Sequence, residues 1–408
     1  MKKIIFIVLI IVFFLCGFKT SSEEELRCVF ISYIELKEYL NNDYSKSKEN
    51  INTIIKNVHD NKLNTIILQV RSNCDSIYKS SIYPTSINLN INEGDEYFDV
   101  LDYFIKESSK YDIKIIAWIN PYRVRTTIDT NTISINSPAY KYLNTDYIYI
   151  NNGIYFNPSK QEVEDFIVNG VKEIIKNYKV YGILFDDYFY PSPDIDYLDY
   201  TKYIEEKGYI DSKTYHLNII NKMVSRVHKE CKDKNILFGI SPDGNINNNY
   251  ENIYADIYKW LDSSDYVDFI MPQIYYAFYN EKMPFYKVVN EWNSIIKNKD
   301  IDLIVALALY KSGNIDKYAL SGSEEWINNN DIIKREVIIS RNMSNYKGFS
   351  LFRYDNLISK DNFTLKKEVA NLHQILNWYF YFYKTLSIIK IESRVRNWKQ
   401  SKEKKDLH

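Results

Sequence analysis

Short apolar runs alternate with longer amphipathic segments along most of this chain. The short runs are rich in β-branched and aromatic residues and are mostly continuous in their apolar character, which is typical of strands buried on both faces. We expect strands at residues 28–33, 65–70, 114–119, 182–185, 236–241, 267–271, 303–307 and 348–352. Between these runs, apolar residues recur with the helical period. This period predicts helices at about residues 47–60, 97–111, 161–178, 212–231, 251–262, 284–297, 326–342 and 363–376.

The order of these elements predicts the fold class. Eight strand–helix repeats spread over about 350 residues are typical of an α/β fold of the (β/α)8 TIM-barrel type. A doubly wound open sheet is the alternative, and it would usually carry a glycine-rich phosphate-binding turn after its first strand. Here the first strand leads into Ile34–Lys37, which contains no glycine. We therefore expect one barrel domain at residues 26–376.

The first 25 residues have the layout of an export signal. Two lysines follow the initiating methionine, an unbroken apolar run extends from Ile4 to Leu15, and polar residues follow. The apolar run is shorter than the about 20 residues of a membrane span. A cleaved signal peptide, an uncleaved anchor and a lipid-modified Cys16 stay open as alternatives, although Leu15 stands where a lipoprotein site normally has a small residue. In each case we expect an exported protein at the cell surface or outside the cell, which a membrane anchor or lipid could retain at the membrane.

The C-terminal tail, residues 377–408, is aromatic and apolar at first and then basic. Such a composition suits the surface of a membrane. Packing against the barrel and an extension without fixed structure are equally open, as is the oligomeric state.

Composition excludes several function classes. The 52 Lys and Arg balance the 53 Asp and Glu, so the net charge of −1 gives no sign of a nucleic-acid binder. The 5 His and 4 Cys form none of the usual zinc-binding spacings, and we expect neither a metal nor a cofactor. The 38 tyrosines reflect either an AT-rich genome or a surface that stacks on sugar rings.

Polar and aromatic residues follow most of the predicted strands. The C-terminal ends of barrel strands meet at one face, where the active sites of (β/α)8 enzymes lie. These residues are Gln69 and Arg71 after the second strand, Trp118, Asn120, Tyr122 and Arg123 after the third, Asp186, Asp187, Tyr188 and Tyr190 after the fourth, Asp243 after the fifth, Gln273, Tyr275 and Tyr276 after the sixth, and Asp355 after the eighth. Helix capping alone would explain one or two such ends, so the pattern indicates a site.

Asp186 and Asp187 are the candidate catalytic residues. Two adjacent carboxylates enclosed at a strand end repel each other, which raises the pKa of at least one of them. A general acid is kept protonated beside an ionised partner in this way. Asp243 is the candidate for a second carboxylate, although an Asp-Gly turn is the alternative for it, and Asp355 is a weaker candidate. The separation of acid and base decides between inversion and retention, and the sequence leaves it open.

The remaining residues at the strand ends suit substrate binding. Polar side chains that could donate hydrogen bonds to sugar substituents are Gln69, Arg71, Asn120, Arg123 and Gln273. Aromatic side chains that could stack on sugar rings are Trp118, Tyr122, Tyr188, Tyr190, Tyr275 and Tyr276. For any single aromatic residue, packing in the core is the alternative.

Together these motifs resemble the glycosyl-hydrolase-like 10 family of secreted bacterial proteins, over about residues 27–376. The matching stretches are residues 68–71 (LQVR), 117–123 (AWINPYR), 156–158 (FNP), 185–191 (FDDYFYP), 238–242 (FGISP) and 271–275 (MPQIY). The resemblance implies a (β/α)8 barrel, a location in the cell envelope and glycoside hydrolase activity. At least one member of the family acts on peptidoglycan strands stripped of their stem peptides.

Two stretches depart from the family pattern. Asp243 and Gly244 stand where the family usually has Phe-Gly, and residues 213–218 replace a stretch that commonly contains Trp-Arg-Arg. There is also a fainter likeness to family 18 chitinases, whose acidic residue falls on Phe189 here, so a chitinase-like substrate-assisted mechanism is not supported. We expect an exported glycoside hydrolase of a cell-envelope glycan, with the peptidoglycan backbone as its substrate. A catalytically degenerate glycan-binding protein and a membrane-associated scaffold are the alternatives.

Overall fold

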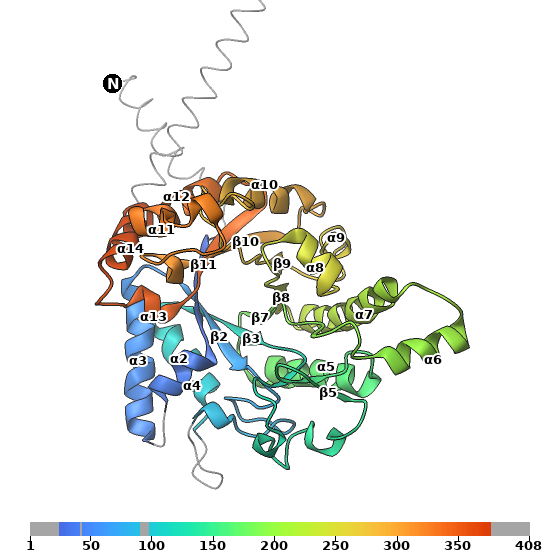
Figure 1. The fold of residues 1–408 in the computed structure, drawn as a ribbon. Helices are drawn as coiled ribbons and strands as arrows, with labels where there is room; N and C mark the ends of the chain where they lie inside the picture. Colours follow the sequence, from blue (N-terminus) through green and yellow to red (C-terminus); the bar gives the residue numbers. More distant parts are fainter. Residues whose placement is uncertain (1–23, 41–42, 90–97, 377–408) are drawn as a thin grey trace, which may run out of the picture.

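The computed structural model describes residues 24–40, 43–89 and 98–376 (Figure 1). Nearly all of the expected signal or anchor segment at residues 1–25, including Cys16, lies outside the described residues, and so does the tail at 377–408. Among the helices that are described, none combines the length and the apolar character that a membrane crossing requires.

In the described part of the chain, eight parallel strands close into a barrel (Figure 1). They are β1 (Leu26–Ile31), β2 (Thr65–Arg71), β3 (Lys114–Ile119), β7 (Gly182–Phe185), β8 (Leu237–Ile240), β9 (Phe269–Ile270), β10 (Asp302–Leu307) and β11 (Tyr346–Leu351). Strand β1 pairs with β2 on one side and with β11 on the other, which closes the ring. The predicted (β/α)8 barrel is confirmed.

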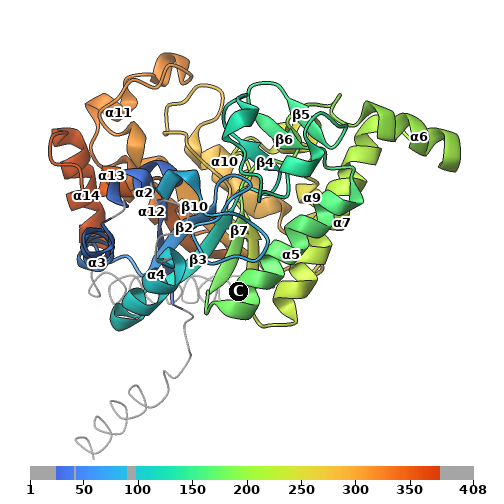
Figure 2. The ribbon, with the colours of Figure 1, turned by 90° about the horizontal axis from the view of Figure 1, so that it is seen from below.

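Helices surround the barrel (Figure 2). They are α2 (Tyr33–Tyr39), α3 (Tyr44–Asp60), α4 (Val100–Ser108), α5 (Gln161–Asn177), α6 (Tyr197–Lys207), α7 (Ser212–Lys232), α8 (Ile246–Asn252), α9 (Ile257–Trp260), α10 (Phe285–Ile295), α11 (Glu325–Asn328), α12 (Ile332–Ser340), α13 (Tyr354–Leu357) and α14 (Phe363–Leu376). The single helices predicted at 251–262 and 326–342 were wrong. Tyr254 has a left-handed φ of 54° between α8 and α9, and Asn329 is extended between α11 and α12.

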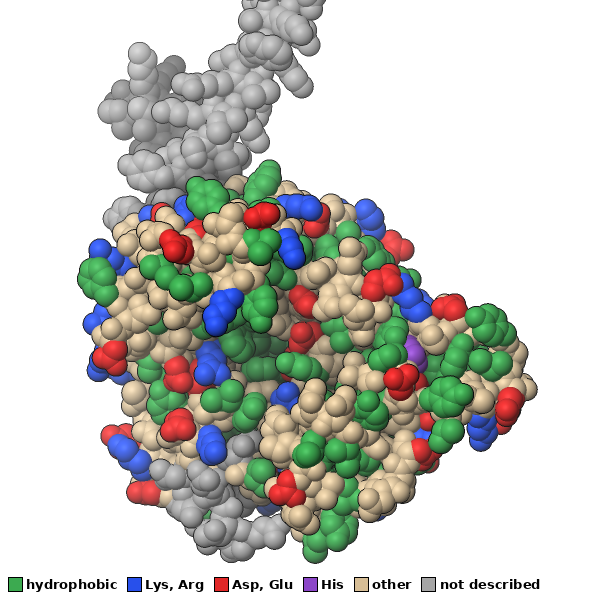
Figure 3. All heavy atoms as spheres, viewed as in Figure 1, with side chains coloured by type: hydrophobic (Ala, Val, Ile, Leu, Met, Phe, Trp, Pro, Cys, Tyr) green, Lys and Arg blue, Asp and Glu red, His purple; other side chains and the backbone are tan. Residues whose placement is uncertain are grey.

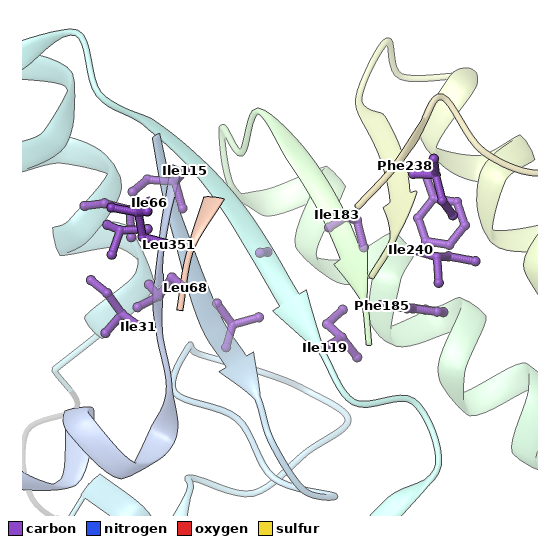
Figure 4. Close-up of a cluster of buried hydrophobic side chains, with 14 of the residues drawn as sticks. Ile31, Ile66, Leu68, Ile115, Ile119, Ile183, Phe185, Phe238, Ile240 and Leu351 are labelled. Carbon is purple, nitrogen blue, oxygen red and sulfur yellow. The ribbon is translucent and has the colours of Figure 1, made fainter. Parts of the chain in front are cut away.

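Side chains of the barrel strands alternate between two apolar layers. On β2, Ile66 and Leu68 point outward against the helices (Figure 4), whereas Ile67 lies in the smaller cluster that fills the barrel. This alternation follows from the period of two along a strand, and each buried side chain contributes about 1.5–3 kcal/mol. Inside the barrel, an added Cβ at Gly239 would overlap the ring of Phe269, so only glycine fits there.

A small antiparallel sheet at one end of the barrel was not predicted. It consists of β4 (Arg123–Arg125), β5 (Ile148–Ile150) and β6 (Ile154–Phe156), in the order β4-β6-β5. Figure 2 shows this sheet and α6 at the same end of the barrel. A fully buried ion pair between Arg125 and Asp75, with 2.9 Å between Nη1 and Oδ2, ties the sheet to the loop that follows β2.

Candidate active site

Asp186 is buried at the mouth of the barrel, directly after β7. Its side chain is 4% exposed. Trp118, in β3, donates from Nε1 to Oδ2 of Asp186 at 3.0 Å, and Asn120 donates from Nδ2 to both carboxylate oxygens at 2.9 and 3.2 Å. Asn120 is itself fixed, because its Oδ1 accepts the backbone N–H of Arg123 at 3.2 Å. The neighbouring strand therefore holds this carboxylate in one orientation.

The groups around Asp186 act on its pKa in opposite directions. Burial raises the pKa of Asp186, whereas the positive charge of Arg123 and the donors on Trp118 and Asn120 lower it. Hydrogen bonds from N–H groups stabilise a carboxylate in its ionised form. Burial outweighs these effects, so the pKa of Asp186 is raised overall, and the donors stabilise the ionised form of this fixed, buried carboxylate.

The surroundings of Asp187 favour its protonated form, so this side chain can donate a proton. Burial, followed by the negative charges of Asp186 and Asp243, raises the pKa of Asp187 to about 7. A hydrogen bond from the side chain of Gln273 opposes these effects, and Gln273 is fixed because its Nε2 donates to the carbonyl of Ser241 at 3.0 Å. A group with a pKa near the working pH is well suited to general acid catalysis.

Asp243 stands close enough to act on Asp187, but it belongs to a turn. Its carboxylate accepts hydrogen bonds from the backbone N–H of Asn245 at 2.8 Å and from Nδ2 of Asn248 at 2.6 Å. The hydroxyl of Tyr276 also bonds to it. Next to it, an added Cβ at Gly244 would overlap the carbonyl of Gln273. The structure therefore favours the Asp-Gly turn over a free second carboxylate.

Arg123 lies at the mouth between two tyrosines. Its guanidinium carbon is 5.4 Å from the centre of the Tyr188 ring and 6.0 Å from that of Tyr33. Its Nε donates to the carbonyl of Ser72 at 2.9 Å, and its terminal nitrogens have no hydrogen bond to any described residue. Tyr188 is 53% exposed. Both side chains are therefore placed to meet a ligand.

A chain of aromatic rings continues from Trp118 across the mouth. Phe30 of β1 meets Trp118 edge-on, with ring centres 5.3 Å apart, and Phe352 lies 5.5 Å from Phe30. Tyr275 lies 5.7 Å from Phe352 and 5.9 Å from Tyr310. Phe30, Phe352 and Tyr310 were not predicted as site residues, and the position of Phe352 directly after β11 was the available signal.

Several of the predicted site residues do not hydrogen-bond to the aspartate pair or stack on the aromatic rings at the mouth. Gln69 accepts the backbone N–H of Tyr33 at 3.0 Å. Arg71 stacks on the Tyr83 ring at 4.4 Å, because the pairing of β2 with β3 shifts in register just before it. The buried hydroxyl of Tyr122 makes no hydrogen bond within the described residues.

Two further strand-end residues also serve the fold. Tyr190 donates from its hydroxyl to Oδ2 of Asp196 at 2.6 Å. Asp355 accepts the hydroxyl of Tyr39 at 3.1 Å. Both side chains therefore connect neighbouring segments of the rim.

Figure 3 shows this face of the molecule hollowed over the middle of the barrel, with hydrophobic side chains inside and charged side chains at the edge. Among the described residues, no group of three or more His, Cys, Asp or Glu side chains is arranged to hold a metal ion. The arrangement combines a fixed anion, a proton donor and an aromatic surface, which together suit acid-catalysed cleavage of a sugar bond.

Comparison with known proteins identifies the family. Residues 25–321 match the glycosyl hydrolase-like 10 family. The chain belongs to the glycosyl hydrolase-like 10 family. One relative is glycosyl hydrolase YngK of Bacillus subtilis (strain 168), 28% identical over 364 residues, or 83% of this chain and 69% of the relative. Another is glycosyl hydrolase DigH of Escherichia coli (strain K12), 29% identical over 325 residues, or 72% of this chain and 73% of the relative. This member of the family is a glycoside hydrolase.

Solved structures share the fold of this family member. The glycoside hydrolase domain of PgaB (BpsB) from Bordetella bronchiseptica matches with a TM-score of 0.56 at 11% identity, covering 87% of this chain and 99% of that domain. The catalytic domain of β-amylase from Paenibacillus polymyxa matches with a TM-score of 0.51 at 12% identity, covering 86% and 98%. At these identities the likeness establishes the barrel fold.

The stretch that departs from the Trp-Arg-Arg pattern of the family begins α7. Here Nε2 of His216 lies 3.0 Å from Oδ1 of Asp196, whose other oxygen accepts the hydroxyl of Tyr190. The His216 ring packs between the rings of Tyr190 and Tyr254, with centres 4.6 and 4.5 Å away. In this family member the stretch thus supports the loop that follows the aspartate pair.

Proposed function

We propose that the protein is an exported hydrolase of a cell-envelope glycan and that its substrate is the peptidoglycan backbone. The observation that carries the catalytic part is the pairing of Asp187, whose pKa is raised to about 7, with the buried carboxylate of Asp186. Asp187 gives its proton to the glycosidic oxygen as the bond breaks, a step that contributes about 10²–10⁴-fold to the rate.

The charge at the mouth supports a peptidoglycan strand without stem peptides as the substrate. Removal of the peptides leaves a free lactyl carboxylate on every muramic acid residue. The terminal nitrogens of Arg123 are a suitable partner for such a carboxylate, because a guanidinium binds carboxylates through two parallel hydrogen bonds. The exposed ring of Tyr188 lies beside this guanidinium and offers a stacking surface to the sugar. The signal-like residues 1–25 support export.

Mass spectrometry of the products tests the proposal. The purified protein is incubated with intact peptidoglycan, with peptide-free glycan strands and with chitin oligomers. We expect shorter sugars with new reducing ends from the peptide-free strands, and loss of this activity in the Asp187→Asn variant. Asp262→Asn is the matched control, because Asp262 is an exposed aspartate away from the mouth of the barrel.

Two outcomes would contradict the proposal. Cleavage of chitin oligomers but of no peptidoglycan strand would exclude the substrate. Binding of the strands without cleavage of any of them would indicate a glycan-binding protein that has lost catalysis.

A further inference from the structure

Both carboxylates of the pair start from a single strand end. Asp186 leans toward β3, where it is held by Trp118 and Asn120, and Asp187 leans toward the loops after β8 and β9, where it meets Gln273. Because both residues directly follow β7, they stand on the same wall of the mouth. Direct displacement at a sugar carbon also needs a group on the face opposite the leaving oxygen.

Among the described residues, carboxylates near the other strand ends are already engaged. The backbone N–H groups of Ser32 and Asp355 donate to Glu35 at 2.7 and 2.9 Å. Lys311 Nζ donates to Asp316 at 2.7 Å. The carboxylates of Asp355 and Asp243 are held by local donors, as described above. These side chains fix loops, and none of them is presented to a ligand as Asp187 is.

We propose that the substrate supplies the nucleophile that the described residues do not present, the carbonyl oxygen of its own 2-acetamido group, and that Asp186 orients this group by accepting its N–H. The inference rests on the proposed function, because both sugars of the peptidoglycan backbone carry a 2-acetamido group. Some glycoside hydrolases use substrate assistance of this kind in place of a protein nucleophile. A fixed buried anion suits this role, because positive charge develops on the acetamido group as it attacks.

The reaction then has two balanced steps. First, the acetamido oxygen bonds to C1 while the bond from C1 to the glycosidic oxygen breaks, and Asp187 transfers its proton to that oxygen. The intermediate is a five-membered oxazolinium ring whose N–H is held by Asp186. Second, water loses a proton to Asp187 and attacks C1, which breaks the new C1–O bond and restores both the amide and the protonated Asp187. C1 is inverted twice, so its configuration is retained.

The proposed catalytic acid stands at another position in the sequence than the acid of family 18 chitinases, to which the chain shows a faint likeness. The chitinase acid corresponds in sequence to Phe189, which is fully buried and packs on Trp260 with ring centres 5.8 Å apart. Asp187, two residues earlier, takes that role here. The sequence does not support the chitinase form of substrate assistance, with its acid at position 189, and the form proposed here uses Asp187 instead.

A substrate series tests the inference with the wild-type protein. Peptide-free glycan strands are chemically de-N-acetylated and then re-acylated with either acetyl or trifluoroacetyl groups. Fluorine withdraws electrons from the carbonyl oxygen and weakens it as a nucleophile. We expect cleavage of the trifluoroacetyl strands to be slower by about 100-fold or more, the size of effect seen when one group that stabilises developing charge is removed. Proton NMR at early times should show that the released anomer keeps the configuration of the cleaved bond.

The outcomes separate the inference from the proposed function. Equal rates on the two strands, or inversion of the anomer, would overturn the inference and leave the hydrolase intact. Failure to cleave even the re-acetylated strands would overturn the proposed function and this inference with it. The substrate series uses the wild-type protein, so its result does not depend on whether a variant folds. Asp186→Asn, compared with Asp262→Asn, adds a second readout: cleavage of the acetyl strands should be lost in Asp186→Asn alone.

Discussion

Replacing Trp118 with phenylalanine isolates the hydrogen bond that holds Asp186. The change removes the Nε1–H that donates to Asp186 at 3.0 Å, and it keeps an aromatic ring against Phe30. If the ionised form of Asp186 is the one that works, this variant should lose catalysis. It should also need a higher pH to reach its full rate.

The size of the effect follows from the environment of the bond. Asp186 is 4% exposed, so water does not replace the lost donor. A hydrogen bond to a charged group contributes about 1.5–3 kcal/mol, and about 1.4 kcal/mol corresponds to a factor of ten in rate. We therefore expect kcat to fall by about 10- to 150-fold. The donor lowers the pKa of Asp186, so its removal raises that pKa and moves the acidic limb of the pH profile to higher pH.

The assay is kcat and KM on peptide-free glycan strands from about pH 4 to pH 9, a range that spans the ordinary pKa of Asp and the raised pKa of Asp187. Trp260→Phe is the matched control, because Trp260 is also buried and its Nε1 donates to Oδ1 of Asn221 at 2.6 Å, not to either aspartate of the pair. Both variants should lose stability, and only Trp118→Phe should lose kcat. An unchanged acidic limb in Trp118→Phe would refute the assignment of Asp186 as a working anion.

Three further predictions concern charge. Asp243→Asn removes a negative charge that raises the pKa of Asp187, so the basic limb of the kcat/KM profile should move to lower pH. Arg123→Gln should raise KM for peptide-free strands by about tenfold, whereas Arg71→Gln should leave KM unchanged, because Arg71 packs on a tyrosine away from the mouth. Burial raises the pKa of Glu368 to about 7. The fold is therefore expected to lose stability as pH rises from about 4.3, where an unfolded Glu ionises, through 7. Melting temperatures at pH 5 and pH 8 should differ less in Glu368→Gln.

The barrel could be predicted from the sequence because its strands are buried on both faces. Runs such as residues 114–119 and 182–185 then consist almost entirely of apolar residues, and the structure has strands with the same bounds. The division of residues 251–262 into two helices was not predictable from periodicity, because the break depends on the left-handed backbone of Tyr254. The small sheet of β4 to β6 was missed because three-residue strands are too short to show a period.

The site was predictable only as far as strand ends could be located. Asp186, Trp118 and Asn120 meet because β3 and β7 are neighbours in the barrel. Arg71 has an equally suggestive position, but a shift in strand register directs it elsewhere, and register leaves no trace in composition. Phe30 has only apolar character, so the sequence could not distinguish it from the core.

The three cysteines of the described residues give this protein a set of built-in reporters of local opening. Cys28 lies inside the barrel, Cys74 in the loop after β2 and Cys231 in α7, and all three are free and buried. Burial raises the pKa of Cys28 to about 12 and also raises those of Cys74 and Cys231. Because the thiolate is the reactive form, each thiol stays unreactive while its surroundings are closed. The rates at which a thiol reagent modifies the three positions therefore rank the stability of the barrel interior, the rim and the outer helices within one molecule.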